Sequence, residues 1–262
     1  MTKSAYRMTA ETLSASTIET YRQQGFVHIP SVLTAAEVEE FRAQAQEGEQ
    51  RLKEKALRYR NPVFTQLVNV WREDEGMRKL TLHSNVAELA EQLAGIPLRL
   101  WHDQMLIKQP HISTPTEFHQ DQPYWPHANS THSLTAWIAL VDVPVERGCM
   151  TFLPETSTQI ELVAQDLTDK EDLFRKCPEL RWSPRVTIPL RAGDCTFHHA
   201  RTAHMANANV TDLPRIAHAI IYMDATTTYT KQPHIVTDPL QLEEGKLITG
   251  ELFPTVASMR TR

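Results

Sequence analysis

The sequence predicts an α+β protein in which helices come first and an antiparallel β sandwich or barrel follows. Helix-capping patterns occupy the first part of the chain, and short runs rich in β-branched and aromatic residues, separated by Pro, Gly and Asn, fill it from Leu98 onward. No fixed-period repeat and no low-complexity tract interrupts the 262 residues. We therefore expect one domain over residues 16–262, preceded by a flexible arm at 1–15.

Three pairs with capping-box spacing predict helices, because the first side chain can accept a backbone hydrogen bond that the second returns. The pairs are Ser16 with Glu19, Thr34 with Glu37, and Asn85 with Glu88. The first helix should reach Tyr21 and close at Gly25 before a strand Phe26–Ile29, the second should run into the charged stretch to Lys55, and the third should end at Gly95.

Seven later segments are typical of strands, and one segment among them is typical of a helix. The predicted strands are Leu98–Lys108, Glu117–Asp121, Leu134–Val143, Cys149–Leu153, Val186–Leu190, Cys195–His199 and Ile216–Met223, and the predicted helix is Gln165–Lys176.

Composition excludes several classes of protein. The net charge of −5, without a long basic run, argues against nucleic-acid binding, and no apolar run approaches the roughly 20 residues that span a bilayer. Three cysteines without a CxxC pair argue against a disulfide framework and a thiolate zinc site. We expect a cytoplasmic protein, monomeric or homodimeric, that acts on a small molecule.

Twelve histidines raise the question of a metal site. His119 and Asp121 lie two apart in a predicted strand, so both side chains should leave the same face and converge on one ion. The spacing alone is weak evidence, because such pairs also arise by chance. Support comes from the later segment that runs from Gly193-Asp194 through His198-His199 to His204, followed by Asn209 and Arg215.

Taken together, these segments resemble the phytanoyl-CoA dioxygenase family of Fe(II)- and 2-oxoglutarate-dependent oxygenases. The resemblance extends from about Phe26 to Met223, and it is carried by His119-Gln120-Asp121, Gly148-Cys149-Met150, Leu153-Pro154, Gly193-Asp194, His199, His204, Asn209 and Arg215. It implies a double-stranded β-helix (jelly roll) at about 98–223, N-terminal helices packed on one sheet, and a C-terminal tail at 224–262.

The resemblance also implies the cofactors and the residues that hold them. His119, Asp121 and His204 match the three ligands of ferrous iron, a set that leaves adjacent coordination positions open for 2-oxoglutarate and O2. Residue chemistry alone does not decide which later histidine binds the metal, and His199 and then His198 follow His204 as second and third choices. Asp121 argues for hydroxylation or a related oxidation, because related halogenases lack this carboxylate.

Arg215 opens a strand with largely apolar or small neighbours, where a buried guanidinium needs an anionic partner. By resemblance it clamps the distal carboxylate of 2-oxoglutarate, and the alternative is a surface salt bridge to Asp212 or Asp224. Trp137, Met105 and Lys108 resemble residues around the same cosubstrate. Because Met105 and Lys108 lie three apart, a regular strand would point them to opposite faces, so both line one pocket only if the strand bulges. Trp137 is equally well explained as a core aromatic, and Lys108 as protection of a sheet edge.

Substrate contacts are predicted at Tyr124 and Trp125, directly after the first two ligands, and at Arg201 near His204. Two departures from the family pattern concern the same surroundings. Glu155 and Ser157 stand where the family often has glycine and histidine, and Ala206 stands where a serine is frequent. The first change affects the backbone that the turn permits, and the last removes a hydroxyl from the cosubstrate end.

The predicted function is therefore oxidation of a small organic substrate, with release of succinate and CO2. Two alternatives stay open at this point. One is a cupin-like metal dioxygenase or isomerase that uses no 2-oxoglutarate, and the other is a non-catalytic jelly roll that binds a small ligand.

Overall fold

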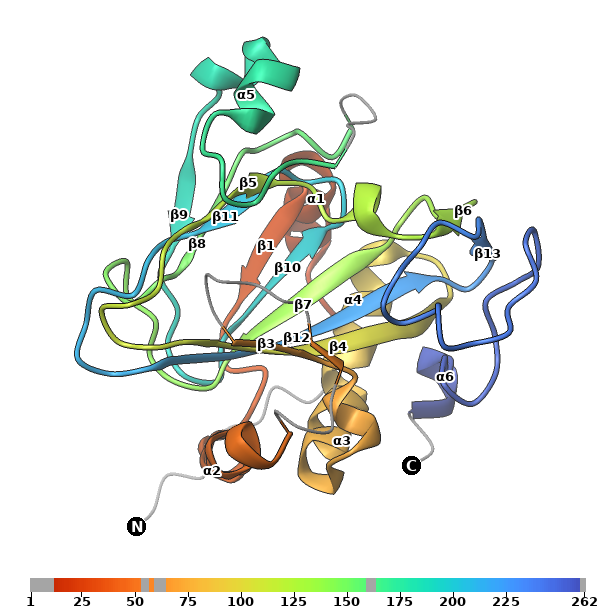
Figure 1. Ribbon diagram of the computed structural model, residues 1–262, viewed down its shortest axis with the longest axis horizontal. Coiled ribbons are helices and arrows are strands. Elements are labelled where there is room, and N and C mark those ends of the chain that lie inside the picture. Colours follow the sequence, from red (N-terminus) through yellow and green to blue (C-terminus); the bar gives the residue numbers. More distant parts are fainter. Residues whose placement is uncertain (1–11, 53–56, 59–64, 159–163, 260–262) are drawn as a thin grey trace.

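The computed structural model describes residues 12–52, 57–58, 65–158 and 164–259. Two antiparallel sheets of seven and four strands form its core, and helices lie outside the larger one (Figure 1). This arrangement is a double-stranded β-helix with N-terminal helices, so the predicted α+β class is confirmed. Within the described residues, no helix combines the length and the apolar character that a membrane crossing requires.

The strand order fixes which segments lie side by side. The larger sheet runs β1 (Phe26–Ile29), β10 (Cys195–His199), β7 (Leu134–Ala139), β12 (Arg215–Asp224), β4 (Leu98–Lys108), β3 (Thr65–Val68) and β2 (Leu57–Arg58); the smaller runs β5 (Thr116–His119), β11 (His204–Ala206), β8 (Met150–Phe152) and β9 (Val186–Ile188). A separate ribbon pairs β13 (Thr228–Tyr229) with β6 (His127–Ala128).

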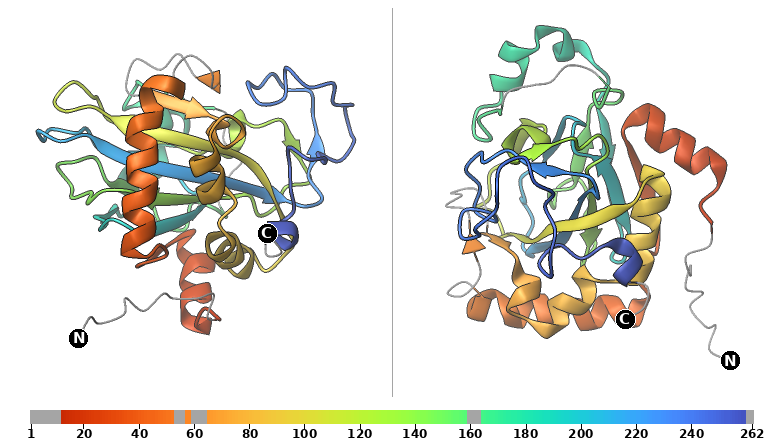
Figure 2. Two further views of the ribbon diagram at one scale, coloured as in Figure 1. Left: turned by 90° about the horizontal axis from the view of Figure 1, so that it is seen from below. Right: turned by 90° about the vertical axis from the view of Figure 1, so that its right-hand side faces the viewer.

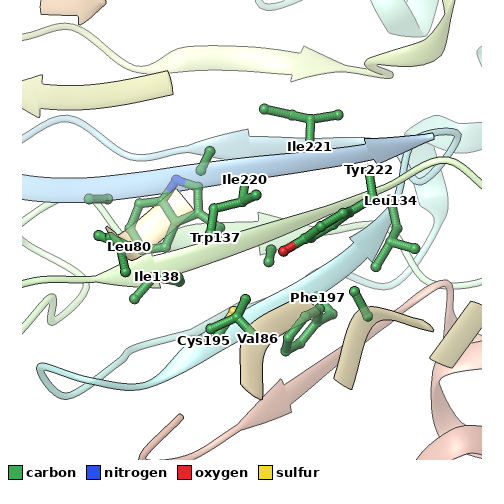
Figure 3. Packing of buried hydrophobic residues seen from close by; sticks show 14 of the residues in the cluster. Leu80, Val86, Leu134, Trp137, Ile138, Cys195, Phe197, Ile220, Ile221 and Tyr222 are labelled. Atoms are coloured by element: carbon green, nitrogen blue, oxygen red, sulfur yellow. The ribbon is translucent and has the colours of Figure 1, made fainter. Parts of the chain in front are cut away.

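The register of the larger sheet separates two sets of side chains, because successive residues of a strand point to opposite faces. On β7, β10 and β12 the set that includes Thr135, His198 and Arg215 faces the smaller sheet, and the alternate residues face the helices. Figure 3 shows that second set: Leu134, Ile138, Cys195, Phe197, Ile220 and Tyr222 gather with Leu80 and Val86 from two helices, whereas Ile221 projects from the opposite face.

Helices pack on the outer face of the larger sheet, as Figure 2 shows. They are α1 (Ala15–Gln24), α2 (Ala35–Leu52), α3 (Glu75–Thr81), α4 (Ser84–Ala94) and α6 (Val256–Met259), and the short α5 (Asp172–Lys176) stands apart beside the smaller sheet (Figure 1). Three 3-10 turns complete the set: η1 (Val70–Arg72), η2 (Gln122–Tyr124) and η3 (Pro178–Trp182).

The helix boundaries confirm one predicted cap and correct two. Thr34 and Glu37 form the reciprocal pair, with the Glu37 amide donating to Thr34 Oγ1 at 3.2 Å and the Thr34 amide donating to Glu37 Oε2 at 2.8 Å. The first helix is capped by Ser14 rather than Ser16, because it is the Ser14 hydroxyl that accepts from the Thr17 amide. The third begins at Ser84 after His83, and the Asn85 amide group donates instead to the Val32 carbonyl.

Gly25 and Gly95 close their helices in the left-handed region, as predicted. Residues 53–55 of the predicted second helix and residues 1–11 of the predicted arm lie outside the described residues.

The predicted strands are all present: β1, β4 and β10 have the predicted bounds, β12 is one residue longer at each end, and β5, β7, β8 and β9 are shorter. The main error is at Glu117–Asp121, because the strand ends at His119 and Asp121 has helical dihedral angles at the start of η2. Only the end of the predicted helix Gln165–Lys176 is helical. The elements that were not predicted are β2, β3, β6, β11, β13, α3, α6 and the three 3-10 turns.

A polar network lies within the core on the helix side of β4. The Asp103 carboxylate is fully buried and accepts from the Thr81 hydroxyl at 2.7 Å and from the Trp71 amide at 3.0 Å. His218 Nε2 lies 3.5 Å from the same carboxylate. Burial raises the pKa of Asp103 to about 7, which outweighs the opposing effect of these hydrogen bonds.

This raised pKa predicts a pH dependence of stability. Between pH 4 and 7 the folded protein holds a proton on Asp103 that the unfolded chain releases, so stability falls as the pH rises through this window. Between pH 5 and pH 8, the free energy of unfolding of the wild type should fall by about 2 kcal/mol more than that of the neutral variant Asp103→Asn. Urea unfolding at both pH values measures the difference, and parallel losses in the two proteins would contradict the assignment.

Candidate active site

Strand pairing brings two of the predicted ligands together. His119 is the last residue of β5 and His204 the first of β11, and the two are directly paired across the antiparallel ladder. Asp121 joins them from outside the strand, because the Asp121 and Gln122 amides both donate to the Ala200 carbonyl and turn the chain back. The prediction that Asp121 lies on the same strand as His119 was thus wrong, although the two side chains do converge.

The three side chains form a group suited to a metal ion. One donor atom from each of His119, Asp121 and His204 lies within 4.8 Å of the others. Asp121 Oδ1 is 3.5 Å from His119 Nε2 and 3.8 Å from His204 Nε2. Each imidazole uses its other nitrogen for a backbone carbonyl, Glu117 O at 2.8 Å and Thr202 O at 2.9 Å respectively. If Nδ1 donates these bonds, both Nε2 lone pairs are free for a metal.

The electrostatics favour the protonation states that a metal requires. Burial and then the neighbouring His119 hold the pKa of His204 well below its usual range, so this imidazole is neutral. Burial alone would raise the pKa of Asp121, but the adjacent imidazoles, His204 foremost, outweigh it and hold the pKa well below the usual range. A neutral imidazole and an ionised carboxylate are the states in which these groups bind a metal.

The other two histidine candidates are separated by the alternation of β10. The His199 ring turns away from the site, with Nε2 3.1 Å from the Thr131 carbonyl and Nδ1 accepting from the Arg201 amide. His198 points into the site, with Nε2 3.6 Å from Asp121 Oδ2. His198 therefore lies closer to the proposed ligands than His199, which reverses the predicted order of the second and third choices.

A cavity of about 740 Å³ lies between the two sheets, and the three predicted ligands form part of its wall. Trp137, Thr135 and Arg215 face it from the larger sheet, and Met150 and Ala206 face it from the smaller one. A cavity of this size lies in the range of small-molecule sites and can hold an oxo acid together with a second compound.

Arg215 stands in this cavity wall with only 1% of its surface exposed. Its guanidinium lies 5.2 Å from the centre of the Trp137 ring and donates to the Leu106 carbonyl at 3.3 Å, and Nε has no hydrogen-bond partner. Among the described residues no carboxylate pairs with it, so the alternative salt bridges to Asp212 and Asp224 are absent. Burial lowers the pKa of Arg215 to about 9.

Two residues predicted to line the cosubstrate pocket do not line the cavity. Met105 pairs with His218 on the helix side of the sheet, because β4 does not bulge between positions 105 and 108. Lys108 lies opposite Arg215 on the inner side, but its ammonium group donates to the carbonyls of Thr114, Ala206 and Asn207 at 2.8–3.1 Å. Burial first and Arg215 second lower the pKa of Lys108 to about 6.

The predicted substrate contacts divide in a similar way. Tyr124 and Trp125 both line the cavity, and the Tyr124 hydroxyl donates to the Gln165 carbonyl. Arg201 does not line it, because its side chain turns to Gln122 and Nε donates to Gln122 Oε1 at 2.8 Å.

The departures from the family pattern have local structural consequences. Glu155 adopts the positive φ of 66° that glycine would favour, so the turn is retained by a residue that pays a steric penalty there. Ser157 lies beside Gly25 and not at the cavity. Ala206 does line the cavity, and its methyl group adds no hydrogen-bonding group there.

Several lining residues were not predicted. Gln66 on β3 and Gln104 on β4 face the cavity and share a hydrogen bond of 3.1 Å. The C-terminal tail contributes Gln232, His234 and Asp238. Alternation along β4 could have identified Gln104 once Lys108 was placed, whereas neither β3 nor the tail carries a pattern that points to the site.

The geometry predicts how the three histidine candidates differ in metal binding. His204→Ala should weaken binding of Fe(II), measured anaerobically by equilibrium dialysis, by at least about 100-fold, because it removes a direct ligand. His199→Ala is the control and should bind iron like the wild type, because its ring faces away. Equal losses in the two variants, with both folded by circular dichroism, would contradict this ligand set.

Comparison with known proteins shows the family to which the chain belongs. The family model described as Phytanoyl-CoA dioxygenase (PhyH) matches residues 21–217. The chain is 26% identical over 215 residues to the methylphosphonate hydroxylase of Gimesia maris, a match that covers 78% of each protein.

Two solved structures are more similar. The non-haem α-ketoglutarate-dependent carbocyclase SnoK from nogalamycin biosynthesis is 40% identical, with a TM-score of 0.85 over 95% of this chain and 99% of that one. The epimerase SnoN, solved in complex with Fe3+, α-ketoglutarate and nogalamycin RO, is also 40% identical, with a TM-score of 0.79 over 92% of this chain and 97% of that one.

Proposed function

Because the chain belongs to the phytanoyl-CoA dioxygenase family and is a non-haem iron, 2-oxoglutarate-dependent oxygenase of a small organic substrate, we propose that His119, Asp121 and His204 hold its Fe(II). The donor set fits ferrous iron, since two imidazoles and a carboxylate on one side leave the remaining positions open. With 2-oxoglutarate and O2, the bound metal would supply the oxidation of a substrate carbon, coupled to the conversion of 2-oxoglutarate into succinate and CO2.

Arg215 binds the distal carboxylate of 2-oxoglutarate in this proposal. The observation that carries it is a buried guanidinium that faces the same cavity as the iron ligands and has no carboxylate partner among the described residues. A buried charge of this kind is costly until an anion pairs with it, and its planar donors match a carboxylate. The guanidinium of Arg215 lies over the ring of Trp137, and this contact limits the orientation of the guanidinium.

Substitution of Arg215 tests the assignment. Arg215→Ala should weaken binding of 2-oxoglutarate at least about tenfold, because it removes charge-assisted hydrogen bonds worth roughly 1.5–3 kcal/mol. The measurement is an anaerobic titration of the Fe(II) protein, followed by the weak visible charge-transfer band of the chelated complex.

Arg201→Ala is the matched control, because its side chain lies outside the cavity and should leave the titration unchanged. Wild-type affinity in Arg215→Ala would refute the role. A wild-type protein that turns over substrate without 2-oxoglutarate would favour the cupin-like alternative instead.

The substrate in this proposal is a bulky natural-product intermediate that contains aromatic rings. The similarity to SnoK and SnoN supports this class, and so does the cavity, which is larger than 2-oxoglutarate needs. The rings of Tyr124, Trp125 and His234 line it and offer flat apolar surfaces for a ring system. We further infer a cytoplasmic enzyme that works as a monomer or homodimer.

A substrate panel tests this class. Nogalamycin-type compounds should stimulate succinate release well above the rate without substrate, whereas methylphosphonate, amino acids and acyl-CoA thioesters should not. Mass spectrometry of the product then separates hydroxylation, which adds one oxygen, from ring closure, which removes two hydrogens, and from epimerisation, which leaves the mass unchanged. Stimulation by acyl-CoA thioesters or methylphosphonate alone would overturn the proposed class, and silence across the panel with iron bound would favour a binding protein.

A further inference from the structure

His198 is a buried polar side chain in the wall of the cavity, and it is not one of the three proposed metal ligands. Only 1% of its surface is exposed, and neither ring nitrogen has a hydrogen-bond partner among the described residues. An imidazole buried in this way costs free energy unless something accepts or donates to it. The unsatisfied ring therefore needs an explanation from its surroundings.

The ring of His198 lies beside Oδ2 of the Asp121 carboxylate, the oxygen that does not face the two proposed histidine ligands. His198 on β10 is directly paired with Thr135 on β7, so both side chains project from the same face of the sheet. Thr135 Oγ1 donates to Asp121 Oδ2 at 3.2 Å, and His198 Nε2 lies 3.6 Å from the same oxygen. The other oxygen, Oδ1, is the one that faces His119 and His204.

We propose that His198 is a positioning residue for the metal: together with Thr135 it holds Oδ2 of Asp121, so that the carboxylate binds iron through Oδ1 alone. The inference rests on the proposed iron site. His198 acts as the Nε2–H tautomer, and a small movement of Asp121 as it binds the ion shortens the contact to a hydrogen bond.

The consequence concerns the number of open coordination positions. A carboxylate that binds through both oxygens occupies two positions, and with two imidazoles it would leave only two for the other reactants. A carboxylate restricted to one oxygen leaves three, which is what a bidentate oxo acid and O2 require. Residues that orient a ligand in this way affect metal affinity and activity by about 10- to 100-fold.

His198 is not placed as a fourth ligand. Among the described residues, the one group whose donor atoms lie within 4.8 Å of one another consists of His119, Asp121 and His204. The His198 ring lies against its neighbours instead, with its centre 4.4 Å from that of His204 and 5.5 Å from that of Phe152. These contacts orient its edge toward Asp121.

Three variants test the role. His198→Phe keeps a ring of similar size and removes the donor, His198→Gln restores a donor, and Thr135→Val removes the second donor at nearly constant volume. Mn(II) affinity should fall about tenfold or more in His198→Phe, recover in part in His198→Gln, and fall less in Thr135→Val. In the Fe(II) protein with 2-oxoglutarate, His198→Phe should shift the charge-transfer band and release more succinate per product.

His28→Phe is the control for stability, because it removes a hydrogen bond to Asp194 from β1, next to β10, and touches no metal ligand. It should leave Mn(II) affinity and the band unchanged. Wild-type values in His198→Phe would overturn the proposal, and so would a loss as large as that of His204→Ala, which would make His198 a direct ligand. A wild-type protein that binds Mn(II) but gives no band with 2-oxoglutarate would refute the proposed function, whereas the comparison of Mn(II) affinities would still decide the role of His198.

Discussion

The direct pairing of β5 with β11 is the constraint on which the candidate site depends. It sets His119 against His204 at the point where both strands meet the cavity, and the chain can bring Asp121 to them only by leaving the ladder. The fixed register of the larger sheet supplies the facing wall, because alternate residues of β7, β10 and β12 must point inward. Neither set of side chains can shift by one residue without exchanging site residues for core residues.

Buried polar groups lie on both faces of the larger sheet, the helix side and the cavity side. On the helix side, Asp103 Oδ2 accepts from the Thr81 hydroxyl and the Trp71 amide, although Asp103 Oδ1 and His218 Nδ1 have no hydrogen-bond partner among the described residues. On the cavity side, Arg215 and His198 retain atoms without protein partners, although both are nearly fully buried. The atoms on the cavity side differ in their surroundings, because they face a space in which a polar ligand can complete their hydrogen bonding.

The sequence predicted the fold class, most strands and the three side chains that converge, because alternation, capping pairs and motif order are local or family-wide properties. It failed where tertiary contacts decide. Asp121 leaves the strand because two amides bind the Ala200 carbonyl, and Met105 faces the helices because β4 stays regular. Gln66 and the tail residue His234 could not be foreseen, because their place at the cavity depends on long-range pairing that leaves no periodic trace. His198 was ranked below His199 because His199 matches the strand-end histidine of the family pattern, which does not indicate the face from which its side chain projects.

The opposed pair of Lys108 and Arg215 has a consequence for the enzyme before catalysis begins. The two side chains face each other on adjacent strands, and burial lowers the pKa of Lys108 to about 6 and that of Arg215 to about 9, so at neutral pH the charge of this pair lies on Arg215. A buried guanidinium without an anionic partner makes the protein less stable than its packing alone would allow, and a dicarboxylate that pairs with Arg215, as we propose for 2-oxoglutarate, relieves this cost. Resistance to heat thus becomes a measure of cosubstrate occupancy, and starvation for 2-oxoglutarate would shorten the lifetime of the folded enzyme.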